Sequence, residues 1–165
     1  ENDIIITSGG VSKSESDHFR SIIKNFGKIE ISNIAIKPGK PLIIGKIYDS
    51  TFIGLPGNPV AMFVTFIRLI RPIILRLSGV KDININVYEI QSGFEYTKKP
   101  DRTEWIRVSV ITDENGKMTA YKYSSQGSGI LSSIVYSDGF VELDDNITKI
   151  RKNSPIRFLP FKEVI

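Results

Sequence analysis

Apolar and polar positions in the first half of the chain follow strand-like and helix-like patterns in turn. Short apolar runs typical of strands recur at residues 4–7, 29–36, 42–44 and 52–53. After the first run, apolar residues return at the spacing of one helix face, at Phe19, Ile22, Ile23 and Phe26. A longer helical pattern covers residues 59–77 and contains Pro72, which is expected to kink the helix. Strands that alternate with helices predict an α/β unit with a largely parallel sheet.

Two turns in the pattern predict hairpins. The runs at 42–44 and 52–53 flank a turn near residue 49 and could pair with each other. Beyond about residue 83 the chain becomes β-rich, and residues 102–112 and 117–123 flank an Asp-Glu-Asn-Gly turn. The second half therefore predicts a small all-β domain, a sandwich or a partly closed barrel. We expect two domains, at residues 1–80 and 81–165.

Composition excludes several classes of site. The chain has 165 residues, a net charge of +4 and no cysteine, which excludes disulfides, thiol catalysis and thiolate metal ligands. With His18 as the only histidine, a histidine-rich metal site is excluded too. The basic residues are scattered, which argues against nucleic-acid binding. Arg68, Arg71 and Arg76 interrupt the most apolar segment, so we expect no membrane span and a cytoplasmic protein.

A strand–turn–helix junction is expected at residues 54–59, with the sequence Gly-Leu-Pro-Gly-Asn-Pro. Asn58 is suited to the N-cap of the following helix and Pro59 to its first position. Glycines allow a ligand to approach the backbone, and a helix start offers unpaired N–H groups. The junction is thus a candidate anion site; an ordinary, well-capped βα turn is the alternative.

Two further loops carry anion-binding chemistry. Residues 7–12, Thr-Ser-Gly-Gly-Val-Ser, end a strand and precede Asp17; the alternative is a tight turn with Asp17 favoured by the helix dipole. Lys37 and Lys40 lie on a proline-stiffened loop, where they could contact an anion or simply be solvated. Arg107 and Ser128 in the β-rich half are weaker candidates, because lone residues of these types are usually surface residues.

The three loops of the first half lie at strand ends or turns of one sheet, so we expect them to converge at one sheet edge. No Ser/His/Asp arrangement and no pair of carboxylates is placed for hydrolysis. The residues alone therefore predict a binder of a phosphorylated or oxyanionic ligand.

The motifs at 7–12, 36–41 and 54–59, in this order and spacing, resemble the MoeA/gephyrin E-domain family of molybdopterin molybdenumtransferases. Residues 126–128, Gln-Gly-Ser, are similar to the serine loop of that family's C-terminal β-domain. The resemblance implies part of a three-layer α/β/α, MogA-like molybdopterin-binding domain with a mostly parallel sheet, followed by a small all-β domain.

The resemblance also implies an activity: insertion of molybdate, a substrate, into adenylylated molybdopterin with release of AMP. It implies Mg²⁺ as cofactor, with no ligands specified, and a homodimer in the full-length protein. By motif position, the implied catalytic residues are Asp17, Lys37 and Lys40. The implied substrate-binding residues are Ser8, Gly9, Gly10, Ser12, Pro56, Gly57, Asn58, Pro59, Arg107 and Ser128.

Some features depart from the family pattern. Lys13 and Ser14 stand where the family often has Val-Gly, and Asn33 stands where some members have a lysine. The chain is similar only to the C-terminal portion of such an enzyme, so we expect the chain alone to bind ligand without turnover. The alternative is a non-catalytic scaffold that binds a pterin, a nucleotide or another protein.

Overall fold

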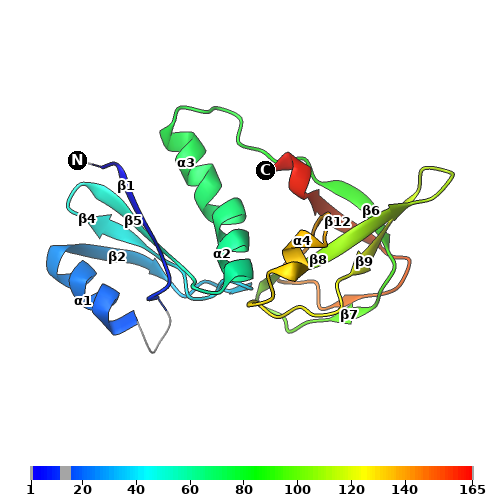
Figure 1. Cartoon of the computed structure of the whole chain (residues 1–165), viewed down its shortest axis with the longest axis horizontal. Helices are drawn as coiled ribbons and strands as arrows, with labels where there is room; N and C mark the ends of the chain where they lie inside the picture. The colour runs from blue at the N-terminus through cyan, green and yellow to red at the C-terminus, as the bar shows by residue number, and fades with distance from the viewer. Residues whose placement is uncertain (1, 12–15, 165) are drawn as a thin grey trace.

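The computed structural model describes residues 2–11 and 16–164, except for the side chains of residues 16–18 and 20. Its elements form a sheet lobe and a barrel lobe on the two sides of one long helix (Figure 1). The sheet lobe and the helix contain β1 (Ile4–Ser8), α1 (Ser16–Phe26), β2 (Gly27–Ser32), β3 (Ile36–Lys37), β4 (Ile43–Ile47), β5 (Ser50–Leu55), α2 (Pro59–Thr65), the π-helical turn η1 (Phe66–Ile70) and α3 (Arg71–Leu77).

The sheet of the first lobe is mostly antiparallel, with the order β1-β5-β4-β2. Among its described strands, β1 and β5 are parallel, whereas β5–β4 and β4–β2 are antiparallel. The turn at Tyr48 and Asp49 joins β4 directly to β5, and so short a connection forces neighbouring strands to run in opposite directions. The hairpin predicted around residue 49 is therefore confirmed.

The predicted fold class is wrong. The chain is mostly β, with 38% strand and 21% helix, and it contains a closed β-barrel. It is not a three-layer α/β/α domain with a parallel sheet. The prediction failed because alternating strand and helix patterns were interpreted as βαβ units, which need a crossover between neighbouring strands. Here β4 and β5 are joined by a turn, and β2 pairs with β4 antiparallel.

Two apolar cores lie against the sheet. One joins α1 to the sheet through Ile23, which is fully buried, together with Ile43 and Phe52. Ile22 and Phe26, also on the predicted α1 stripe, are about half exposed, so the buried stripe is narrower than the pattern suggested. The other core joins the long helix to the sheet through residues such as Ile53 and Ile70.

The long helix covers residues 59–77, as predicted, but it is not α-helical throughout. Its α2 and α3 segments are separated by the π turn η1, which ends at Ile70, two residues before Pro72. Proline has no N–H to donate, and its ring conflicts with the carbonyl four residues earlier, here that of Arg68. The irregularity predicted at Pro72 therefore takes the form of a π turn in the preceding residues.

The second half forms the barrel lobe. Its elements are β6 (Tyr88–Ser92), β7 (Tyr96–Thr97), β8 (Thr103–Thr112), β9 (Met118–Lys122), α4 (Ser132–Val135), β10 (Gly139–Leu143), β11 (Lys149–Ile150), β12 (Pro155–Pro160) and the 3₁₀ turn η2 (Phe161–Glu163). The hairpin predicted around residues 113–116 is confirmed, since β8 and β9 pair antiparallel across it.

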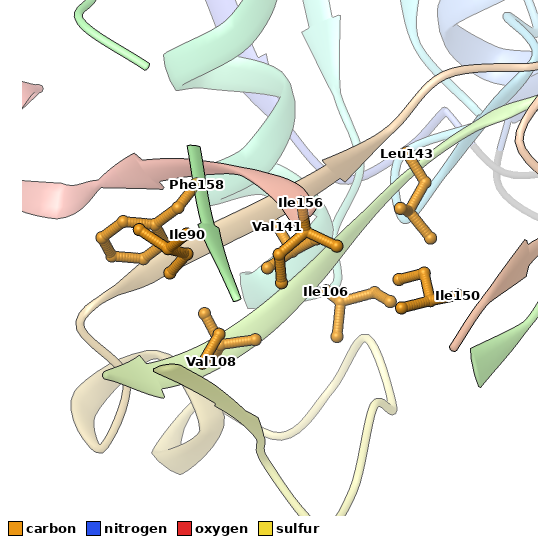
Figure 2. Close-up of a cluster of buried hydrophobic side chains, with 9 residues drawn as sticks. Ile90, Ile106, Val108, Val141, Leu143, Ile150, Ile156 and Phe158 are labelled. Atoms are coloured by element: carbon orange, nitrogen blue, oxygen red, sulfur yellow. The ribbon is translucent and has the colours of Figure 1, made fainter. Parts of the chain in front are cut away.

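The barrel closes because β8 is long enough to pair with two strands, β9 and β10. The sheet order is β10-β12-β6-β9-β8, and β8 pairs back with β10. Residues 104–108 of β8 pair with β10, and residues 108–112 pair with β9. Figure 2 shows the apolar side chains that fill the interior, among them Ile106, Val141 and Phe158. The all-β half is thus a closed barrel, not a sandwich.

The two lobes share a core and a strand pair. Val60 and Val64 of α2 are fully buried in a cluster that also contains Trp105, Phe140 and Leu159 of the barrel. The short strand β3 joins the barrel sheet beside β8, in parallel register. These contacts hold the loops of the two lobes next to each other. None of the helices in the described part of the chain is both long and apolar enough to cross a membrane.

Candidate functional site

A pocket of about 380 Å³ opens where the two lobes meet. Four segments that are distant in the sequence form its wall: β3 with the loop after it, the turn before α2 with the start of that helix, the residue just before β8, and the loop between β9 and α4. The lining residues are Ile36, Lys37, Pro38, Gly39, Lys40, Pro41, Pro56, Asn58, Ala61, Arg102, Gln126, Gly127 and Ser128. Its cationic lining residues are Lys37, Lys40 and Arg102, and no acidic residue that the structure describes lines it.

Residues 37–41, which we call the lysine loop, are held against α2 by a close backbone approach at Gly39. This residue has a φ of 116°, and a Cβ built on it would lie 2.4 Å from Thr65 Cγ2. Only glycine meets both conditions, because the left-handed region and the short distance each disfavour a side chain. The loop places Lys37 and Lys40 on the pocket wall, as two of its three cations.

The Gly-Gly loop after β1 contacts the turn before α2 without lining the pocket. The Gly9 N–H donates to the Leu55 carbonyl at 3.0 Å, and a Cβ on Gly57 would lie 3.3 Å from Gly9 Cα. The structure therefore brings the first loop next to the turn, while Ser8, Gly9 and Gly10 are absent from the described lining. Ser12 and the Asp17 side chain lie outside the described residues.

The start of α2 is joined to the barrel by hydrogen bonds to Ser128. Asn58 makes no side-chain cap to its own helix, and its Nδ2 donates to Ser128 Oγ at 3.1 Å. The Val60 N–H donates to the Ser128 carbonyl at 3.1 Å. Pro59 has no N–H to offer. Ser128 therefore lies at the pocket wall and also fastens the barrel loop to α2.

Arg107 lies behind the pocket and does not line it. Its side chain is among the largest that are fully buried. Nε donates to Ser133 Oγ at 3.1 Å, and Nη2 donates to the Gly127 carbonyl at 3.1 Å. The Arg107 backbone also exchanges two hydrogen bonds with the Gln126 side chain. Desolvation lowers the pKa of Arg107. The resemblance placed Arg107 at the site; the structure places it beneath the loop that carries Ser128.

Sequence reasoning missed three residues of the site: Arg102, Glu104 and Tyr96. Arg102 lines the pocket, and its Nε donates to Glu104 Oε1 at 2.7 Å. Tyr96 donates to Glu104 Oε2 at 2.8 Å; burial and this hydrogen bond raise the pKa of Tyr96 to about 12. Side chains alternate between the two faces of a strand, so residues 102 and 104 lie on one face, and this spacing was the sequence signal that could have linked Arg102 to Glu104. Their partner Lys37 lies far away in the sequence, and no local pattern indicates it.

The described side chains do not fit a divalent cation. In the described part of the chain, no three His, Cys, Asp or Glu residues come together as possible ligands. The pocket is lined by cationic and neutral residues, whereas Mg²⁺ takes carboxylate and other oxygen ligands. Asp17, the carboxylate that the resemblance implies, has no described side chain. The described lining therefore suits an anionic group and does not suit magnesium.

Comparison with known proteins links both halves to one kind of protein. Residues 1–76 match the family described as "Probable molybdopterin binding domain", and residues 89–161 match "MoeA C-terminal region (domain IV)". A molybdopterin molybdenumtransferase of Haemophilus influenzae is 32% identical over 99% of this chain and 41% of its own length. The molybdenum cofactor synthesis protein cinnamon of Drosophila melanogaster is 34% identical over 86% of this chain and 24% of its own.

A solved structure gives the same result for the fold. The MoeA molybdopterin biosynthesis protein of Pyrococcus horikoshii is 28% identical, with a TM-score of 0.74 over 96% of this chain and 37% of that one. The chain thus spans less than half the length of these relatives.

Proposed function

This chain belongs to the MoeA family, and from that premise we propose that it is part of a molybdopterin molybdenumtransferase whose substrate binds in the pocket between the two lobes. The reaction is the insertion of molybdate into adenylylated molybdopterin, with release of AMP. The observation that carries the proposal is the pocket itself. Lys37, Lys40 and Arg102 line it, and it contains no acidic lining residue among those described.

The pocket residues have distinct parts in this proposal. Lys37 and Lys40 bind anionic groups of the substrate, since an ammonium group makes strong charge-assisted hydrogen bonds to phosphate or molybdate oxygens. Asn58 and Ser128 offer an amide and a hydroxyl at the wall of the same pocket. Arg107 acts indirectly, because it holds the loop that carries Ser128. Pro56 and Gly57 shape the turn that brings Asn58 to the wall.

The remaining expectations concern the longer protein. We propose that it forms the homodimer that the resemblance implies, and that Asp17, Ser8, Gly9, Gly10 and Ser12 contribute to catalysis or binding there. Because the chain spans 41% of the Haemophilus relative, we expect it to bind the pterin without completing molybdenum insertion. Turnover of adenylylated pterin by this chain at the rate of the longer protein would contradict that expectation.

The pocket is tested by titrating the chain with molybdopterin at fixed salt. We expect saturable binding, and we expect Lys37→Ala and Lys40→Ala each to weaken it by about 1–3 kcal/mol, the range of charge-assisted hydrogen bonds. Lys46→Ala is the matched control, because Lys46 is exposed on β4 and does not line the pocket. Absence of binding, or equal affinity in all three variants and the unchanged chain, would reject the pocket as the substrate site.

A further inference from the structure

A buried carboxylate lies directly behind the cationic pocket. The Glu104 side chain is 2% exposed, and Glu104 stands opposite Lys37 in the register of β3 and β8. A buried carboxylate is costly unless opposite charges and hydrogen-bond donors compensate it. The described polar partners of the Glu104 side chain are Arg102, Tyr96 and Lys37, and each is a cation or a donor. The charge of Glu104 is thus compensated by two residues that also line the pocket.

The two oxygens of Glu104 hold different partners. Oε1 accepts from Arg102 Nε at 2.7 Å and also contacts Arg102 Nη2, so it engages one edge of the guanidinium. Oε2 accepts from the Tyr96 hydroxyl at 2.8 Å and lies 3.5 Å from Lys37 Nζ. Lys37 comes from the lysine loop and Arg102 from the barrel. One fixed carboxylate therefore ties two cations that are distant in the sequence to the same point.

Arg102 and Lys37 are accessible from the pocket, although the carboxylate of Glu104 that they contact is buried. The side chains of Arg102 and Lys37 are 31% and 45% exposed, and both line the pocket. With Lys40, three positive charges face one buried negative charge, which leaves a net charge of +2. A guanidinium matches the oxygens of a phosphate in a fixed plane, whereas an ammonium is a point charge. The set suits a group with more than one negative charge.

We propose that Glu104 is a positioning residue that fixes Arg102 and Lys37 as the two halves of one clamp, and that this clamp binds a diphosphate-type group of the substrate through Arg102. The inference rests on the proposed function, for which it names the group that the pocket holds. In an adenylylated phosphate, AMP is joined through a diphosphate bridge. The clamp and Lys40 together offer three positive charges to that bridge.

A competing interpretation gives Glu104 no positioning role. In it, the carboxylate only neutralises part of the positive charge, and the cations would bind an anion as well or better without it. The two interpretations predict opposite signs for Glu104→Gln. This variant keeps the side chain's size and raises the net charge of the site by one. It strengthens anion binding if Glu104 is only a counter-charge, and weakens it if the cations depend on Glu104 for their placement.

The test is calorimetric titration of the chain with inorganic pyrophosphate at fixed pH and ionic strength. We expect Glu104→Gln to weaken binding about fivefold despite its added positive charge, and Arg102→Met to weaken it about tenfold or more. Arg102→Lys should be intermediate, because it keeps the charge and loses the planar fork. Lys99→Met is the matched control, because Lys99 is an exposed cation three residues before Arg102 and does not line the pocket. This variant should bind pyrophosphate with the affinity of the unchanged chain.

Several outcomes overturn the proposal. If the Glu104→Gln variant is folded, as judged by circular dichroism, and binds pyrophosphate as tightly as the unchanged chain or more tightly, Glu104 is only a counter-charge. If Arg102→Met binds pyrophosphate as tightly as Lys99→Met does, Arg102 is not part of the site. If Glu104→Gln does not fold, this comparison between Arg102→Met and Lys99→Met is the test of the clamp. Failure of the unchanged chain to bind pyrophosphate also rejects the clamp. A parallel titration with adenylylated molybdopterin, which carries the diphosphate bridge, separates the two proposals, since binding of this compound that is insensitive to Arg102 rejects the clamp and leaves the proposed function in place.

Discussion

Arg107 uses its guanidinium to hold the loop that carries Ser128. Its contacts go to the Gly127 carbonyl and to Ser133 Oγ, inside the barrel lobe. Ser128 in turn accepts the Val60 N–H at the start of α2. A buried arginine thus acts on the other lobe through one loop. At this scale, a residue can matter to the site without facing the pocket, because the hydrogen bonds it makes determine where other groups lie.

The first prediction concerns Arg107→Met. We expect the free energy of unfolding in urea to fall by about 1–3 kcal/mol, because the loop carbonyl and hydroxyl acceptors lose their donor in a buried place. Amide exchange should also become faster at Val60, whose N–H depends on the position of Ser128. Lys117→Met, on the exposed hairpin, is the control. Unchanged exchange at Val60 in the Arg107 variant would show that the loop keeps its place without the guanidinium.

At the scale of elements, the lysine loop depends on its fit against α2. Gly39 is the residue of closest approach, and Thr65 is its neighbour on the helix. Thr65 Oγ1 donates to the Ala61 carbonyl at 2.8 Å, which leaves its methyl group, Cγ2, toward the loop. The position of the two lysines is therefore determined by packing between a loop and a helix.

The second prediction separates steric conflict from backbone strain at this contact. Gly39→Ala should reduce stability by about 2–4 kcal/mol, because a Cβ both meets Thr65 Cγ2 and occupies the left-handed region. Gly116→Ala is the matched control for strain alone, since its φ is 78° and nothing lies within 4 Å of the added Cβ. The double variant Gly39→Ala/Thr65→Ser removes the methyl group of residue 65 and should regain the part of the stability that Gly39→Ala loses to steric conflict. Equal urea midpoints for Gly39→Ala and Gly116→Ala would contradict this account.

At the scale of the whole molecule, the two lobes depend on one another. Phe63 of α2 packs edge-on against Phe161 at 5.4 Å between ring centroids, and its ring lies 6.0 Å from that of Phe140. Arg68 of the π turn pairs with Glu142 of β10 at 2.6 Å. An apolar core and a largely buried ion pair therefore join the long helix to the barrel, and the same helix packs on the sheet.

The third prediction is that both lobes unfold in one transition. Trp105, the only tryptophan, lies in the shared core, so its fluorescence reports on the junction, while far-ultraviolet circular dichroism reports on the whole chain. Phe63→Ala should lower the stability seen by both probes by about 2–3 kcal/mol, as expected for loss of a partly buried aromatic ring. Phe66→Ala, three residues further along at a more exposed position, should have a smaller effect. Two separate transitions would show that the lobes fold independently.

Local patterns predicted the elements well and their arrangement poorly. The α1 helix, the long helix and both hairpins lie where apolar spacing and turn residues put them, because those signals depend on residues close in the sequence. The direction of pairing in the first sheet and the closure of the barrel depend on which distant strands meet. The pattern of alternating strands and helices did not contain that information, and the predicted parallel α/β/α fold was wrong for this reason.

The sequence by itself determined which residue types the loops carry, and it predicted an anionic ligand. The lysine loop, the glycine-rich turn and the serine loop are contiguous motifs, and their residues already indicate an anion. Only the tertiary structure decided which of these groups line the pocket. It moved Arg107 beneath a loop, joined the α2 start to Ser128, and placed Arg102 and Glu104 beside Lys37. Each of these depends on the β3–β8 pairing and the shared core of the two lobes, which are contacts between distant residues.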